Sequence, residues 1–535
     1  MDAISHDQVK KMEAQLFSSL DVKNRGYITK SELVEKLSKA GVAEKNPRIR
    51  ALYKKLLPCQ NSHKIKLTEF GFLVQEEFSF LHNIFQGDLV IPEFNDFCQE
   101  IEEIYKKVKE NKDGKVADYI PQLGRVDPEK YAVSICTIDG QEFHLGDSKD
   151  KFCVQSSSKP FNYCMALEEF GSEYVHKHVG QEPSGKGFNE LTLNERGLPH
   201  NPMINSGAIM ACSMIKPKLD IADRFDFVLD TWQRLAGKSH VGFNNSVYLS
   251  EKQTADRNFA LGYFMRESGA FPENTNLLDI LEFYFQCCSI ELNSRAMASI
   301  AATLANGGTN PLTEDEVFHP STVKNCLSLM GSCGMYDFSG EFSFKIGLPA
   351  KSGVSGVIIL VIPNVMGISI WSPRLDSIGN SVRGIEFCTE IIEKYNFHNY
   401  DSLVSARLEK KDPRQKKHEK EDQNALEMCW ASCRGDLESL QHMIARGADI
   451  SCADYDGRTP MHLAAAEGHL DVVKYLYAKG ADIQSKDRWG REPLDDASRN
   501  KHRDIEDYIN KIIKKISIKS LRGSLAKKDG LPCEF

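Results

Sequence analysis

The sequence lacks an uninterrupted apolar run long enough to span a bilayer, because its best candidate, residues 357–371, is broken by Pro363 and Asn364. It lacks a basic excess, and a formal net charge of −8 gives no support for nucleic-acid binding. It shows no secretory signal and no arginine-rich, acid-poor transit peptide at its start. The fifteen cysteines therefore indicate buried thiols in a reducing compartment. We expect neither a membrane span nor a nucleic-acid partner.

Paired cysteines at metal-binding spacing are also missing. Cys287 and Cys288 are adjacent, and Cys429 and Cys433 have no matching second pair, so these spacings predict no zinc site. What is present is an ordinary globular composition, 41% hydrophobic and 27% charged, over 535 residues. A chain of this length is expected to fold as several domains.

One short stretch organises the rest. Ser156 and Lys159 form an S-x-x-K pattern directly before an apolar run, which predicts the start of a buried helix. Residues three apart on a helix share a face, so the lysine amine can reach the serine hydroxyl. A neutral lysine, favoured by burial, could activate the serine as a nucleophile. The alternative is that Ser156 caps the helix and Lys159 is solvated, although a capping box would place Glu or Gln there.

Residues 1–110 have the pattern of short amphipathic helices with two degenerate EF-hand loops. The loop from Asp21 to Glu32 keeps the first and last ligand positions, but Lys23 and Arg25 stand at the third and fifth. A second frame, 58–69, begins with proline and has histidine where glycine is needed. We expect no calcium binding and interpret this region as a packing or assembly module.

Residues 111–402 have strand patterns at both ends and helical patterns between them. Residues 131–138 are β-like and precede the turn pair Asp139-Gly140. Residues 357–362 and 366–371 predict another hairpin. This arrangement predicts one α+β domain whose sheet joins its two ends.

The last part of the chain contains a repeat. A charged stretch, 403–423, predicts a flexible linker, and residues 424–512 repeat with a spacing of 33, as Pro460 and Pro493 illustrate. The run 459–464 fits the ankyrin signature T-P-L-H-x-A, so we expect two to three ankyrin repeats. Residues 513–535 are basic and predict a disordered tail.

Further residues, most of them polar, lie in distinctive local sequences along 111–402. They are Tyr119 in DYIPQL, Gln155 beside the S-x-x-K serine, Asn205 in HNPMINSGA, Glu251 and Asn258 in EKQTADRN, Tyr284 in FYFQ, Tyr336 in SCGMYD, and Val354 after the run Lys351-Ser352-Gly353. Taken singly, such residues are mostly caps or surface groups. Together and in this order, they closely resemble the serine-dependent glutaminases, a family with a β-lactamase/transpeptidase-like fold. Animal members also carry an EF-hand-like region before this domain and ankyrin repeats after it.

The resemblance implies hydrolysis of L-glutamine to L-glutamate and ammonia without a metal or organic cofactor. It implies that Ser156 is the nucleophile and that Lys159, helped by Tyr336, is the general base. The backbone N–H groups of Ser156 and Val354 would bind the oxyanion. The resemblance implies substrate contacts by Tyr119, Gln155, Ser156, Asn205, Glu251, Asn258, Tyr284, Tyr336 and Val354.

The resemblance also implies a homotetramer built as a dimer of dimers, a protein partner for the ankyrin repeats, and a mitochondrial location, with the cytoplasm as the alternative. Glu190 and Thr192 depart from the more hydrophobic and basic loop of the kidney-type members, which puts phosphate activation and dimer–dimer contacts in question. Two other functions remain open. One is a β-lactamase-like hydrolase of another amide, and the other is an ankyrin scaffold with an inactive core.

Overall fold

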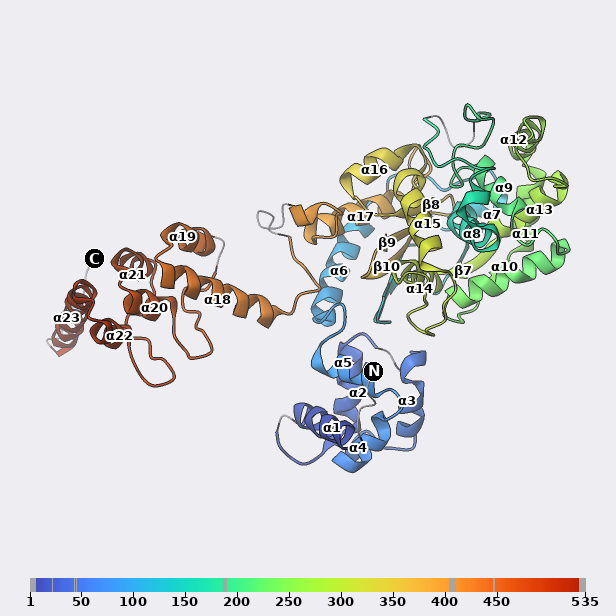
Figure 1. Ribbon diagram of the computed structural model, residues 1–535. Coiled ribbons are helices and arrows are strands. Elements are labelled where there is room, and N and C mark those ends of the chain that lie inside the picture. The colour runs from blue at the N-terminus through green and yellow to red at the C-terminus, as the bar shows by residue number, and fades with distance from the viewer. Residues whose placement is uncertain are drawn as a thin grey trace. The chain divides into compact units, whose positions relative to one another are not determined.

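The chain forms two compact units, Met1–Arg414 and Gln415–Phe535, which we describe separately (Figure 1). The computed structural model describes residues 6–21, 23–42, 44, 46–185, 190–403, 410–445 and 448–528. No helix within these ranges is both long and apolar enough to cross a membrane.

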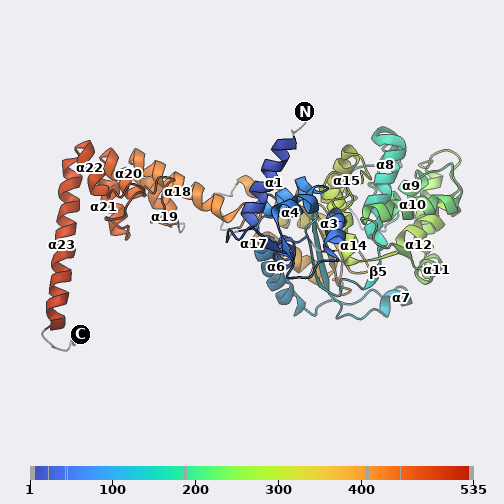
Figure 2. The same cartoon turned by 90° about the horizontal axis from the view of Figure 1, so that it is seen from below.

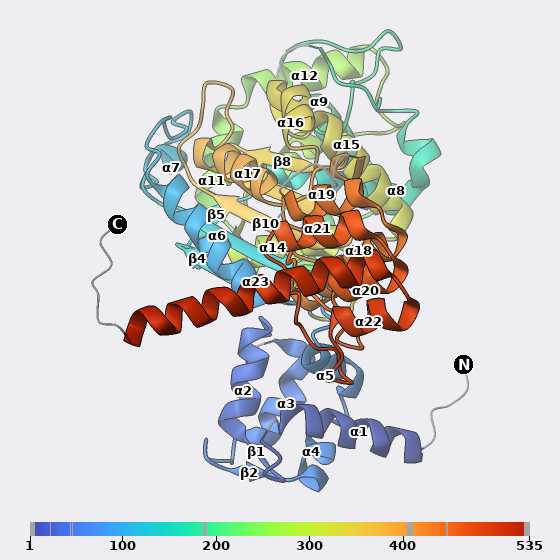
Figure 3. The same ribbon diagram turned by 90° about the vertical axis from the view of Figure 1, so that its left-hand side faces the viewer.

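The N-terminal module is a pair of helix–loop–helix elements around one apolar core, as expected for an EF-hand-like region (Figure 3). Its two loops pair through short antiparallel strands, with Ile28 opposite Ile65. The elements are α1 (His6–Leu20), β1 (Ile28–Thr29), α2 (Lys30–Lys39), α3 (Arg50–Leu56), β2 (Lys64–Ile65), α4 (Leu67–Val74) and α5 (Phe78–Gln86).

In the first loop, the side chain of Arg25 contacts the acidic residues at both ends of the loop. The Arg25 guanidinium donates to both carboxylate oxygens of Glu32 at 2.9 Å, and its Nε lies 3.6 Å from Asp21. Asp21 also accepts the backbone N–H of Gly26 at 2.6 Å. Because Asp21 and Glu32 are the first and last positions of a calcium loop, the guanidinium neutralises the two carboxylates that a calcium ion would need.

The central sheet of the first unit joins the two ends of its domain, which confirms the α+β prediction. Five antiparallel strands lie in the order β4-β3-β10-β9-β8. The predicted hairpin across Asp139-Gly140 is present, and so is the one across 363–365. The strands are β3 (Ala132–Thr137), β4 (Glu142–Gly146), β8 (Ala350–Gly353), β9 (Val357–Ile362) and β10 (Met366–Trp371).

Helices cover both faces of this sheet (Figure 2). Along β9, alternate residues belong to two cores: 357, 359 and 361 pack toward α14 (Ser294–Ala305), and 358, 360 and 362 pack with α6 (Phe94–Lys109) and α17 (Val382–Lys394). Burial on both faces explains why this strand is apolar throughout. Since α6 shares the sheet's core, the expected boundary at residue 110 lies too late, and the EF-hand-like core ends before α6.

A helical lobe with a small sheet, in the order β5-β7-β6, completes the first unit. Its core is continuous with the α14 face of the large sheet. The strands are β5 (Lys151–Cys153), β6 (Gly242–Phe243) and β7 (Ile290–Asn293); the helices are α7 (Pro121–Gly124), α8 (Lys159–Val175), α9 (Asn205–Ser213), α10 (Ile221–Leu235), α11 (Asn245–Gln253), α12 (Asp256–Glu267), α13 (Leu277–Cys288), α15 (Pro320–Cys333) and α16 (Ser339–Lys345).

The predicted linker is shorter than its charge pattern indicated. Residues 404–409 lie outside the described ranges, but Lys410 forms an ion pair with Asp401 at 3.0 Å, and the Lys411 N–H donates to the Lys394 carbonyl at 3.0 Å. Residues from 417 onward already belong to α18. The flexible-linker prediction is therefore wrong for Lys410 and Lys411, which have specific partners, and for residues 417–423, which are helical.

The described residues of the second unit form three helix pairs, in agreement with the two to three predicted ankyrin repeats. His462 of the signature run is fully buried and joins neighbouring repeats, since its Nδ1 lies 2.9 Å from Thr459 Oγ1 and its Nε2 lies 3.0 Å from the Arg491 carbonyl. The helices are α18 (Lys417–Arg434), α19 (Leu437–Ala445), α20 (Pro460–Glu467), α21 (Leu470–Ala478), α22 (Pro493–Asn500) and α23 (Arg503–Lys528).

The prediction of a disordered tail is wrong for residues 513–528. Helix α23 continues to Lys528, so the expected boundary at 512 falls inside a helix. Ile505, Ile509 and Ile512 are buried in the repeat core, and this apolar spacing anchors the helix. Lysine and leucine beyond them favour continuation, because both have good helix propensity.

Close packing of α14 on the sheet predicts a strict requirement for Gly367. A β-carbon there would overlap the backbone of Ala301 and Ala302. We expect Gly367→Ala to lower the free energy of unfolding of the first unit by about 3 kcal/mol or more. Gly331→Ala in α15 is the matched control: no atom lies within 4 Å of its added carbon, so it should be neutral or stabilising. Thermal unfolding of both variants tests this, and equal midpoints would contradict the packing argument.

Candidate active site

The serine and lysine of the S-x-x-K motif lie together at the start of α8. Residues Gln155–Ser158 form one 3-10 turn, η2, which leads directly into the helix. Side chains three apart eclipse in such a turn. Lys159 Nζ accordingly lies 2.9 Å from Ser156 Oγ, and the predicted proximity of these two groups is confirmed.

Lys159 has no exposure to solvent. Burial lowers the pKa of its amine to about 8, from an ordinary value of 10.5. Its second polar partner is Asn205 Oδ1, at 2.7 Å, which comes from the first residue of α9. A neutral carboxamide orients the amine without adding the charge that would hold its proton.

A second buried lysine, Lys351, lies close by. In the sequence it stands out only as part of the run Lys351-Ser352-Gly353. Lys351 on β8 is fully buried, donates to the Ser352 carbonyl at 2.6 Å, and lies 4.6 Å from the centre of the Tyr336 ring. Burial, and then repulsion from Lys159, hold its pKa well below the usual range. The K-S-G run was the signal for this residue, but sequence alone gave it no role.

Tyr336 connects the two lysines. Burial raises the pKa of its hydroxyl, and the side chains of Ser156 and Ser352 oppose that rise. Tyr336 has a φ of 54° and Gln155 a φ of 49°, in the left-handed region that non-glycine residues rarely adopt. Such strain persists only where the surrounding structure imposes it, and it concentrates at functional sites.

A polar network extends from this centre and joins three segments of the chain. Tyr119 Oη donates to Glu251 Oε1 at 2.6 Å, and Gln155 Nε2 donates to the same oxygen at 3.0 Å. Burial raises the pKa of the Glu251 carboxyl, whereas these two donors and Lys159 oppose the rise. The result is a largely desolvated acceptor near the serine.

The amide end of the network centres on Asn205. Its Nδ2 donates to Asn258 Oδ1 at 3.2 Å, and Tyr284 Oη donates to its Oδ1 at 3.4 Å. Asn258 lies on α12 and Tyr284 on α13, so three helices present these groups to one place.

Val354 follows the end of β8, where that strand meets η2. A β-carbon on Gly353 would lie 2.9 Å from the Val154 carbonyl oxygen and 3.4 Å from the Ser157 nitrogen. Only glycine permits this approach, which brings the backbone after β8 to the serine turn.

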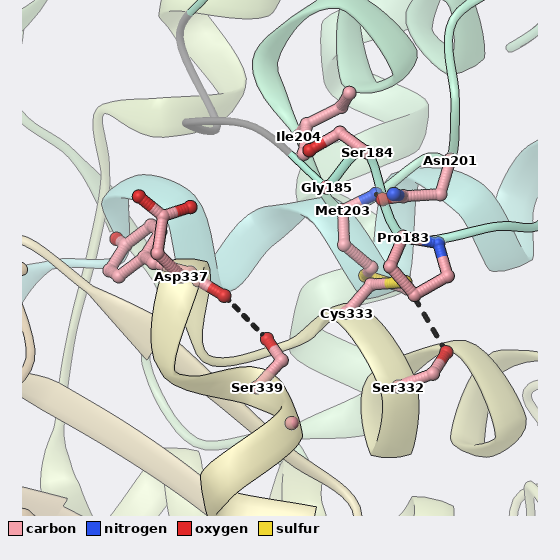
Figure 4. Close-up of a pocket in the computed structure, with 12 residues that line it drawn as sticks. Pro183, Ser184, Gly185, Asn201, Met203, Ile204, Ser332, Cys333, Asp337 and Ser339 are labelled. Carbon is pink, nitrogen blue, oxygen red and sulfur yellow. Dashed lines mark hydrogen bonds between the residues drawn. The ribbon is translucent and has the colours of Figure 1, made fainter. Parts of the chain in front are cut away.

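A pocket of about 480 Å³ opens beside Tyr336 (Figure 4). Pro183, Ser184, Asn201 and Met203 line one side, opposite Ser332, Cys333, Asp337 and Ser339. It provides room for a small molecule next to Tyr336. Glu190 and Thr192 belong to the loop that departs from the kidney-type members, and residues 186–189 of that loop lie outside the described ranges. Glu190 is exposed, and its carbonyl accepts the Thr192 N–H at 3.0 Å.

The structure thus brings all ten predicted site residues into one region. Their convergence agrees with the sequence analysis, but their individual roles remain predictions.

Three protein-family models match the chain. The one described as "Glutaminase" matches residues 114–400, "Ankyrin repeats (3 copies)" matches 428–519, and "EF-hand domain" matches 12–92.

Curated relatives share much of the chain. "Putative glutaminase 3" of Caenorhabditis elegans is 50% identical over 379 residues, 71% of this chain and 65% of that protein. "Putative glutaminase 2" of the same species is 43% identical over 473 residues, 86% and 78% of the two chains. "Glutaminase liver isoform, mitochondrial" of Mus musculus is 45% identical over 397 residues, 74% and 66% of the two chains. The first of these matches spans just under two thirds of the relative's length.

Solved structures agree with this result. "Probable glutaminase ybaS" is 36% identical with a TM-score of 0.53, and the match covers 55% of this chain and 95% of that one. "Mglu" in its native form is 33% identical with a TM-score of 0.54, covering 56% and 72%. The matched family domain holds the Ser156–Lys159 pair and the network around it, and the chain belongs to the glutaminase family.

Proposed function

We propose that this chain hydrolyses L-glutamine to L-glutamate and ammonia through an acyl-enzyme on Ser156. The observation that carries the proposal is the 2.9 Å contact between Ser156 Oγ and the fully buried Lys159 amine, inside the region that matches the glutaminase model. Ammonia release from glutamine by the purified chain is the direct test. Nitrocefin in a parallel assay separates this activity from β-lactam hydrolysis.

The first step is attack on the side-chain amide. Neutral Lys159 accepts the Ser156 proton as the serine oxygen bonds to the amide carbon, and the carbonyl electrons move to the oxygen. The backbone N–H groups of Ser156 and Val354 are our candidates for stabilising this oxyanion. The close approach of β8 to η2 at Gly353 supports this assignment.

The second step releases ammonia. The protonated amine, or Tyr336 acting as a relay, returns the proton to the departing nitrogen as the carbon–nitrogen bond breaks. Tyr336 is a candidate for this relay because burial raises the pKa of its hydroxyl and keeps it protonated beside Ser156. Water then attacks the ester as the same base accepts its proton. When the ester bond breaks to release L-glutamate, that proton returns to the Ser156 oxygen and the base is neutral again. Every group in this cycle belongs to the chain, substrate or solvent, so the reaction as written uses no metal or organic cofactor.

Selection of glutamine requires partners for both charges of an amino acid. We assign the substrate ammonium to Glu251, because a buried carboxylate is costly unless a cation pairs with it. Tyr119 and Gln155, which now donate to Glu251, orient that carboxylate. Asn205, Asn258 and Tyr284 supply hydrogen-bonding groups for the remaining α-amino and α-carboxylate atoms. A neutral lactam without an amino-acid zwitterion lacks the partner that Glu251 needs.

We further propose a homotetramer built as a dimer of dimers, with the ankyrin unit as a site for a protein partner. The family membership and the three-repeat array support these assignments. Two rodent relatives are named mitochondrial, and on that basis we propose a mitochondrial location for this chain.

The nucleophile can be separated from its neighbours. Ser156→Ala should abolish turnover while glutamine binding survives, because only the attacking oxygen is lost. Ser157→Ala is the matched control, since the Ser157 hydroxyl donates to the Val154 carbonyl at 2.5 Å, whereas the lysine amine donates to Ser156 and Asn205. Stopped ammonia release with retained binding by calorimetry is the expected result. An active Ser156→Ala beside a dead Ser157→Ala would contradict the assignment.

The pH dependence tests the base. Below about 8 the Lys159 amine is protonated and cannot accept a proton, so kcat/KM should rise with pH and level off above that value. Asn205→Asp places a carboxylate beside the amine, which should raise its pKa and move the profile to higher pH even where overall activity falls. Lys159→Arg should lose about 10²-fold or more, because arginine stays protonated. A flat profile between about pH 6 and 9 would exclude Lys159 as the base.

Assembly is tested by light scattering over a concentration series. We expect tetramers, or dimers at low concentration given Glu190 and Thr192 in the loop. Deletion of residues 420–535 should leave dimers or tetramers that still release ammonia, because catalytic domains are proposed to make the main contacts. A strict monomer with full activity at high micromolar concentration would contradict the assembly proposal.

A further inference from the structure

The second loop of the EF-hand-like module gathers a different set of donor atoms from the first. Its frame, 58–69, begins at Pro58, which has no side-chain oxygen, so the calcium pattern fails at its first position. Nevertheless, one ligand atom each of Cys59, His63 and Glu69 lies within 4.8 Å of the others. His63 Nε2 and Glu69 Oε1 are 2.7 Å apart.

A thiolate, an imidazole and a carboxylate are the donors that zinc takes in proteins. Zinc accepts these three ligand types together, at about 2.3 Å to sulfur and about 2.0–2.2 Å to nitrogen or oxygen, whereas calcium takes oxygen ligands. Ligand atoms around a tetrahedral ion at those bond lengths stand about 3.3–3.8 Å apart. The His63–Glu69 pair would therefore open by less than about 1.5 Å as the ion replaces the shared proton.

The backbone that carries these side chains is held in place. Lys30 Nζ donates to the Leu56 and Cys59 carbonyls, each at 2.8 Å. The N–H groups of Lys30 and Ser31 donate to the carbonyls of His63 and Asn61, each at 3.1 Å. Glu69 lies in the first turn of α4. Because α2 fixes the loop at several points, an ion would find its ligands arranged in advance.

The site is also accessible. The side chains of His63 and Glu69 are each 38% exposed, and Cys59 is half-buried. An ion can enter from solvent, and a water molecule can complete a fourth position, as at zinc sites with three protein ligands. Paired cysteines, which the sequence lacks at zinc spacing, are unnecessary for such a site.

We propose that Cys59, His63 and Glu69 bind one zinc ion, with solvent as the fourth ligand. The EF-hand-like module then has a cation in each loop: the Arg25 guanidinium in the first and zinc in the second. The zinc ion ties α4 to the loop before it and stabilises the module. This proposal does not depend on the proposed catalytic function, because none of its ligands belongs to the active site.

Cobalt substitution and zinc binding test the proposal on the full chain after treatment with a chelator. We expect one equivalent of Co²⁺ to give thiolate-to-metal charge transfer and the intense visible bands of tetrahedral cobalt, displaced by Zn²⁺. Zinc should also raise the thermal unfolding midpoint of the chain. Cys59→Ser and His63→Ala should each weaken zinc binding about 100-fold or more, because removing even an outer partner of a ligand costs about 10–100-fold.

The control is Cys433→Ser, which removes another partly buried thiol, from the second unit, and should leave all these readouts unchanged. Unfolding of the metal-free variants checks that the fold is intact. The proposal is overturned if no equivalent binds with about micromolar or tighter affinity, or if the cobalt spectrum survives Cys59→Ser. Loss of the spectrum in Cys433→Ser would also overturn it, by locating the thiolate elsewhere.

Discussion

The proposed chemistry depends on the burial of one lysine amine beside one serine hydroxyl. Moving the Lys159 pKa from 10.5 to about 8 corresponds to a penalty of about 3 kcal/mol on the charged form. That penalty makes the amine a base at moderate pH. The fold sustains it because Lys159 opens α8, whose following residues pack into the largest core of the molecule. A solvated lysine in the same position would remain protonated and could not activate Ser156.

The surrounding groups reinforce this state without adding a negative charge directly beside the amine. Asn205 contributes a neutral oxygen, and Lys351 contributes a second amine whose pKa is lowered by burial and by its proximity to Lys159. Glu251 is the nearest acid in the network, yet its carboxylate is directed to Tyr119 and Gln155. The left-handed backbone of Gln155 and Tyr336 places strained residues on both sides of the serine. Amines and amides thus lie beside Ser156, and in the proposed mechanism Glu251 pairs with the substrate's ammonium.

Patterns with a local physical cause could be read from the sequence, and those set by distant partners could not. The doubly buried β9 appears as an unbroken apolar run, and Thr459 with His462 carries the ankyrin signature in a single turn. By contrast, Lys410 and Lys411 look like solvated linker until Asp401 and the Lys394 carbonyl are placed next to them. The sequence indicates that Arg25 disfavours calcium binding. Its contact with Glu32 inside the loop is seen only in the folded structure. The meeting of Cys59, His63 and Glu69 depends on a loop geometry that no cysteine spacing encodes.

The lowered pKa of Lys159 is tested most directly by a pH titration. The titration is monitored by NMR on the protein labelled with ¹³C at the lysine ε-carbons. We expect one lysine resonance that titrates near pH 8 and disappears in Lys159→Arg. We also expect a second resonance with a lowered pKa, from Lys351, which remains in Lys159→Arg. If every lysine resonance instead titrated near the ordinary value of 10.5, the amine would be charged during catalysis and the mechanism would be wrong.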